Sequence, residues 1–210
     1  MRIPFIVRGL LAAGAVAMPL IGNAESNYQT GAASPMTATA HVDFQITIPK
    51  FLFLRVGNGT GTAAGGWATQ AVIDQITWAP TAAQLGTGPL GGTGGDLGGG
   101  TETAVVVANN GNVTLTSSTL GALNDGAAGD TISYTNITTA ASHNTTATVL
   151  AAPALADGAT TTVTLTAVGK IVQQDAKWAY SYANATIPPQ GVYGGINANN
   201  SRVTYTASVP

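Results

Sequence analysis

Side chains capable of acid–base, nucleophilic or metal chemistry are few in this 210-residue chain, and they do not cluster. Cysteine is absent, and the two histidines, His41 and His143, have neither a partner histidine nor an acidic cluster at the spacing of a zinc site. The only glutamates, Glu25 and Glu102, lie far apart, so a paired-carboxylate glycosidase would have to use aspartates in turns. Ser142 precedes His143, but no Gly-x-Ser-x-Gly elbow occurs. The sequence therefore predicts no enzyme, no cofactor and no metal.

Two glycine motifs lack the context that their chemistry requires. Gly86 to Gly91 fits the letters of the dinucleotide fingerprint, which works only where a strand turns into a helix. Gly91 to Asp96 fits the first six positions of a calcium-binding nonapeptide repeat, which holds calcium by stacking several copies. More glycine follows the first motif, and the second occurs once. We expect the whole stretch from Gly86 to Thr101, with nine glycines, to be a long mobile loop.

An aromatic row provides the one pattern that suggests a ligand. Trp178, Tyr180 and Tyr182 alternate along one predicted strand and therefore share a face. Exposed, such a row could stack on sugar rings, as in a secreted carbohydrate-binding module; buried, it fills the core of a sandwich. The alternation does not decide between these two interpretations.

The composition excludes charge-driven partners. Hydrophobic residues make up 45% of the chain and charged residues 8%, with a formal net charge of −2. No basic patch is present to neutralise phosphates, so nucleic acid is not expected as a partner. Without cysteine there is no disulfide framework, and stability must come from burial and strand pairing.

The elements that must position these residues are β-strands. Alternation of apolar and polar residues over Thr37 to Ile48 predicts a strand with one buried face. Further short strands, among them 51–56, 103–108, 112–117, 145–150, 161–168, 177–183 and 202–208, are separated by turn signals such as Asn109-Asn110-Gly111. We expect an all-β protein, a single immunoglobulin-like β-sandwich with a long glycine-rich loop.

The N-terminal residues predict export. Met1 to Ala24 combines Arg2 and Arg8, an apolar stretch and the end Gly22-Asn23-Ala24, the form of a secretory signal peptide. Residues 25–36 are polar and small and predict a flexible tail, which leaves 37–210 for the sandwich. No later segment is apolar enough to span a bilayer, so no integral membrane span is expected after cleavage.

One segment carries a family resemblance. Pro189-Gln190-Gly191-Val192-Tyr193-Gly194-Gly195, followed by Val203-Thr204-Tyr205-Thr206-Ala207, resembles the closing segment of bacterial fimbrial subunits. The absence of cysteine is similar to the common-pilus and colonisation-factor type. The resemblance implies self-association into a pilus at the cell surface, with adhesion and biofilm roles. It also implies a periplasmic chaperone and outer-membrane assembly machinery as partners.

The alternating segment from Thr37 to Ile48 suggests how a fibre could assemble. In donor-strand assembly an N-terminal extension adds main-chain hydrogen bonds to the next subunit and fills a pocket with every second side chain. The same alternation fits the first strand of the chain's own sandwich, pairing in cis. In the fibre interpretation, the strand that carries Val203, Tyr205 and Ala207 forms the edge of the receiving groove. The donor side chains would be Ala40, Val42, Phe44, Ile46 and Ile48.

These observations favour an exported structural or adhesive subunit of an extracellular fibre. The alternative is the secreted carbohydrate-binding module, with Trp178, Tyr180 and Tyr182 as its platform.

Overall fold

A computed structural model describes residues 26–32, 34–57, 72–126 and 129–210. The predicted signal peptide, Met1 to Ala24, lies outside the described residues. The chain divides into two compact units, one ending at Ile48 and the other running from Pro49 to Pro210.

The predicted strand over Thr37 to Ile48 is not formed. Every residue of this stretch is exposed, and none belongs to a strand. The sandwich begins at Pro49 instead of at Thr37. Alternation separates two faces of a chain, but a strand also needs a neighbour for its main-chain hydrogen bonds, and the sequence pattern alone does not supply that neighbour.

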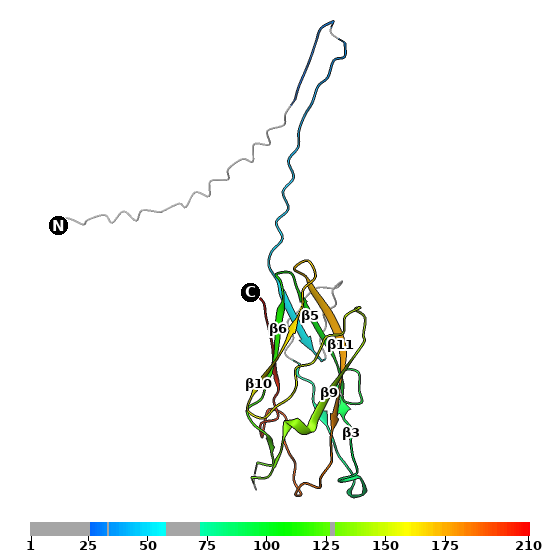
Figure 1. The fold of residues 1–210 in the computed structure, drawn as a ribbon, viewed down its shortest axis with the longest axis vertical. Coiled ribbons are helices and arrows are strands. Elements are labelled where there is room, and N and C mark those ends of the chain that lie inside the picture. The colour runs from blue at the N-terminus through cyan, green and yellow to red at the C-terminus, as the bar shows by residue number, and fades with distance from the viewer. Residues whose placement is uncertain (1–25, 33, 58–71, 127–128) are drawn as a thin grey trace, which may run out of the picture. The chain divides into compact units, whose positions relative to one another are not determined.

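In the described part of the unit from Pro49 to Pro210, two larger antiparallel sheets are accompanied by two short two-stranded sheets (Figure 1). The larger sheet has the order β1-β5-β11, and both β3 and β9 pair with β11. Its strands are β1 (Leu52–Val56), β5 (Thr101–Ala108), β11 (Val172–Tyr182), β9 (Ile137–Ser142) and β3 (Leu90–Gly91). The smaller sheet has the order β10-β6-β12 and consists of β10 (Thr160–Leu165), β6 (Val113–Ser118) and β12 (Thr204–Ser208).

The core lies where these two sheets face each other. Alternate residues of the central strands are fully buried, such as Val106 on β5, Leu115 on β6 and Trp178 on β11. β6 shows the period-two burial that its alternation predicted, whereas β5 is largely buried on both faces. The Trp178 indole N–H donates to the Leu150 carbonyl over 2.8 Å, so the largest buried side chain is also satisfied as a donor. The all-β prediction is confirmed; the finer immunoglobulin-like assignment stays a prediction.

The glycine-rich stretch is more structured than the sequence suggested. It contains β3, which pairs with β11, and β4 (Thr93–Gly94), which pairs with β2 (Ile76–Thr77). A side chain at Gly100 would lie 2.7 Å from the Gly92 Cα, so here the glycines allow two backbones to pack closely. The prediction of a long mobile loop did not anticipate these short strands.

The remaining elements are small. β7 (Leu123–Asn124) pairs with β8 (Thr131–Ile132), and two 3-10 turns cover Ala82–Gln84 and Tyr134–Asn136. Residues 145–150, predicted as a strand, make only an isolated parallel bridge between Val149 and Asp175. Within the described part of the chain, no helix is long and apolar enough to cross a membrane.

Candidate functional site

The predicted groove edge lies on an edge strand. β12 hydrogen-bonds to β6, and no other strand of the described chain pairs with it. Val203, Tyr205 and Ala207 pack against the core but stay only half-buried, while the intervening threonines are exposed. By contrast, Val113 and Leu115 on the neighbouring β6 are completely buried. The inward-facing side chains of this strand therefore keep apolar surface that a further strand could bury.

A second edge strand faces the same side of the sandwich. β1 pairs with β5 alone, and its Leu54 and Val56 are half-buried against the core. Cα atoms of β1 and β12 come within 8 Å of each other, although no ladder joins the two strands. The Lys50 ammonium donates to the Pro210 carbonyl, so the start of β1 lies beside the end of β12. We call this side, formed by β1 and β12, the open seam.

Tyr205 anchors β12 to the core. Its ring lies 5.3 Å from that of Trp178, centroid to centroid, and its hydroxyl is 3.0 Å from the Tyr180 hydroxyl. Burial raises the pKa of Tyr205 to about 12, so the phenol is neutral and can share a proton with Tyr180. One edge of β12 is thus paired to β6 and anchored to the core, while no strand of the described chain pairs with its other edge, near which β1 lies within 8 Å.

The aromatic row belongs to the core. Trp178 is fully buried and Tyr180 is 9% exposed, while Tyr182 is half-buried beside Trp78. The row cannot act as the predicted sugar platform, because β11 is central in its sheet and turns this face toward β6 and β12. Of the two interpretations that the sequence left open, the structure supports the core.

The predicted donor residues are exposed in the unit that ends at Ile48. The exposed fraction is 74% for Val42, 91% for Phe44, 85% for Ile46 and 76% for Ile48, and Ala40 is exposed as well. Single exposed hydrophobic residues are ordinary on protein surfaces, but a row of five at every second position is not. The structure leaves this row without a covering surface in its own unit.

The segment after β9 is fixed to β11 by hydrogen bonds to one buried carboxylate. The Asp175 carboxylate accepts hydrogen bonds from the backbone N–H groups of Thr145 and Thr146, from both threonine hydroxyls and from the Asn144 side chain. Burial alone would raise the Asp175 pKa, but these bonds outweigh it and hold the pKa well below its usual range. The segment 144–150 thereby covers β11 where β9 does not reach.

A buried glutamate that bonds to a half-buried aspartate was missed by the sequence reasoning. Glu102 on β5 is 4% exposed and shares a hydrogen bond with the Asp74 side chain, and the Asp96 N–H donates to its Oε2 over 3.3 Å. Burial, followed by the nearby Asp74 and Asp96 charges, raises the Glu102 pKa to about 8. The signal was present in the sequence, because Glu102 is in phase with the inward residues Ala104 and Val106.

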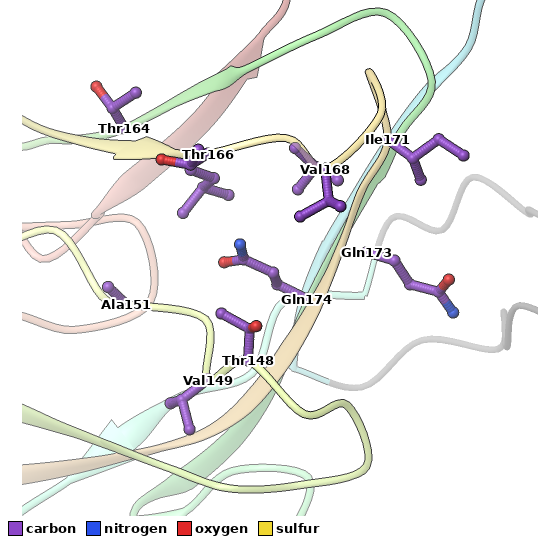
Figure 2. Close-up of a pocket in the computed structure, with 11 residues that line it drawn as sticks. Thr148, Val149, Ala151, Thr164, Thr166, Val168, Ile171, Gln173 and Gln174 are labelled. Atoms are coloured by element: carbon purple, nitrogen blue, oxygen red, sulfur yellow. The ribbon is translucent and has the colours of Figure 1, made fainter.

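A hollow of about 640 Å³ lies between β10 and β11 (Figure 2). Its walls are uncharged and mostly apolar, and include Val149, Leu165, Val168 and Ile171. Figure 2 shows Val168 and Ile171 on the turn that joins the two strands. With no titratable group in the lining, the hollow offers no acid–base chemistry.

Neither the histidines nor the acids form a metal site among the residues that the structure describes. His41 and His143 are both exposed. Comparison with protein-family models, with curated proteins and with solved structures found no match. The strand edges and the exposed apolar row are the features that suggest a function.

Proposed function

We propose that this chain is a structural subunit of an extracellular fibre, assembled by β-strand addition. Residues 37–48 of one copy would pair with the free edge of β12 in the next copy. The observation that supports this is a complementary pair of features: a fully exposed apolar row at every second residue, and an edge strand whose inward row is only half-buried. Each feature supplies what the other lacks.

The free energy of burying apolar side chains favours this pairing. Burying a Val, Ile or Phe side chain contributes about 1.5–3 kcal/mol, and four such residues are exposed between Val42 and Ile48. Pairing with β12 would also satisfy main-chain groups along its outer edge. A strand paired to β12 lies about 4.8 Å from it, so pairing with β12 and β1 together requires the open seam to widen at its narrowest point.

The surface composition fits close packing of copies. Only 8% of residues are charged, so few charges must lose water when subunits come into contact. Export, attachment to a pilus at the cell surface, and the use of a chaperone and outer-membrane assembly machinery remain part of the same proposal. They follow from the N-terminal pattern and the fimbrial resemblance described above.

The test is the multimer pattern of the full-length protein on SDS gels, with and without boiling. Wild type should give a ladder that collapses to monomer on boiling, together with filaments in negative stain. The double variant Phe44→Asp/Ile46→Asp should lower the multimer fraction by about 100-fold, because it removes two apolar contacts and would bury charge. The matched control, Gln45→Asp/Thr47→Asp, adds the same charges to the opposite face and should keep the ladder.

Two outcomes would overturn the proposal. One is a wild-type protein that stays monomeric at every concentration. The other is a ladder that responds equally to both double variants, which would show that the apolar face of 37–48 has no specific role.

A further inference from the structure

The two ends of the sandwich carry separate exposed apolar groups. At the end that holds Pro49 and Pro210, which we call the proximal end, Val168 is 84% exposed and Ile171 is 53% exposed. The opposite, distal end carries Leu120, Ile187, Val192 and Ile196, each between 70% and 82% exposed.

The topology fixes which residues share an end. The Gly111 N–H donates to the Lys170 carbonyl, and the Asn110 side chain donates to the Pro210 carbonyl, so the β10–β11 turn lies beside the start of β1 and the end of β12. β11 then runs away from this turn for 11 residues, a span of about 35 Å. Figure 1 shows the segment between β11 and β12 at the distal end, and this segment contains Ile187, Val192 and Ile196.

Hydrogen bonds connect two of the distal segments. The Asn124 N–H donates to the Asn199 carbonyl over 3.2 Å, and the Gly194 N–H donates to the Asn124 carbonyl over 3.0 Å. These bonds hold β7 against the segment that carries Val192 and Ile196. The exposed Val192 and Ile196 therefore belong to a segment that is hydrogen-bonded to its neighbours.

The charges of the two ends are opposite in sign. Around the proximal end the described residues include Lys170 and Lys50, the latter bonded to Pro210, while Asp175, three residues into β11, is buried beneath Thr145 and Thr146. The distal loops and turns carry Asp96, Asp125, Asp130 and Asp157 against the single basic residue Arg202. A proximal end of one copy and a distal end of another are therefore complementary in charge as well as in apolar character, whereas two like ends would repel.

We propose that the proximal end of one copy, through Val168, Ile171 and Lys170, packs on the distal loops of the next copy around Val192 and Ile196. This contact rests on the proposed function, since the segment 37–48 joins the sandwich at Pro49, on the proximal end. A head-to-tail contact between different surfaces repeats without closing and produces a filament. It adds a second interface to strand addition and orients successive subunits along the fibre.

The absence of cysteine makes a cross-linking test clean. The double variants Val168→Cys/Val192→Cys and Val168→Cys/Ile196→Cys place thiols on the two ends, which can form a disulfide only when their Cα atoms approach to within about 7 Å. After mild oxidation of assembled protein, at least one pair should give multimers that survive boiling and collapse on reduction. The expected excess is about tenfold over the control Val168→Cys/Ala140→Cys, whose second thiol is on the exposed side of β9.

The two proposals fail in different ways. A ladder that forms before boiling, without boil-resistant multimers above the control in either cysteine pair, would overturn the end-to-end contact and leave strand addition standing. Equal cross-linking in Val168→Cys alone would also contradict it, because like ends should not meet. A wild-type protein with no multimers before boiling would overturn both.

Discussion

The segment 37–48 and β12 have the same kind of sequence but differ in structure. Both alternate small or apolar residues with threonine and other polar residues. In β12 the apolar row packs on the core and one edge is hydrogen-bonded to β6, whereas in 37–48 the row is exposed and no strand is formed. Alternation thus determines which face of a segment is apolar, and the tertiary structure determines whether that face meets a partner.

The stability of the sandwich, which includes β12, should depend on pH. Glu102, which influences the pKa of Tyr205 on β12, holds its proton in the folded state up to about pH 8, while in the unfolded chain it ionises near 4.5. The folded state therefore binds more protons between these values, and stability falls as pH rises through that window and levels off above it. We expect a loss of about 2 kcal/mol between pH 5.5 and 7.5, measured by urea unfolding.

The variant Glu102→Gln should remove that slope. Glutamine can still bond to Asp74 and to the Asp96 N–H but does not ionise. The control Asp43→Asn changes an exposed acid in the segment 37–48 and should keep the wild-type slope. Asp175 does not interfere, because its lowered pKa places its contribution below pH 4. Identical slopes in wild type and Glu102→Gln would show that the buried acid does not govern this window.

The segment 37–48 can be supplied as a separate peptide to test whether it binds the sandwich. In the assembly-deficient variant Phe44→Asp/Ile46→Asp, a synthetic peptide of residues 37–48 should bind the open seam of the folded protein. At 100 times its Kd it should add about 2.7 kcal/mol of stability, seen as a rise of roughly 5–10 °C in Tm. A peptide of the same composition in scrambled order should give no shift; an equal shift from both would argue against a register-specific groove.

The smallest expected effect concerns Tyr205, the core contact that β12 has and the segment 37–48 lacks. Tyr205→Phe removes the hydroxyl that meets Tyr180 but keeps the ring against Trp178. We expect a loss of about 1–2 kcal/mol in urea unfolding, because the buried Tyr180 hydroxyl is left without this partner. Thr206→Val, on the exposed face of the same strand, should change stability by less than about 0.5 kcal/mol.

Much of the fold was predictable from the sequence, and particular residues show why the rest was not. Val113 and Leu115 alternate cleanly, so β6 was found. β9 was missed because Ile137 is its only large apolar residue, and its place in the sheet comes from pairing with β11. The stretch 145–150 alternates like a strand, yet Thr145 and Thr146 bond to Asp175, a partner 29 or more residues away that no local pattern reveals.

The candidate site divides in the same way. The residues of the exposed row and of the groove edge could be named from their spacing alone, because alternation is a local property. The exposure of that row, and the half-buried state of Val203, Tyr205 and Ala207, required the three-dimensional arrangement of both sheets. The burial of the aromatic row also needed it, since a face of β11 is core or surface according to which sheet packs on it.

By itself the sequence determined the all-β class, the apolar faces of its strands, and the absence of a disulfide framework and of a basic patch. These properties depend on composition and on residues two apart, which a linear chain displays directly. Only the tertiary structure decided which edges stay open, which acid is buried, and which residues gather at the two ends of the sandwich. Those outcomes depend on contacts between strands far apart in the chain, and no local pattern encodes them.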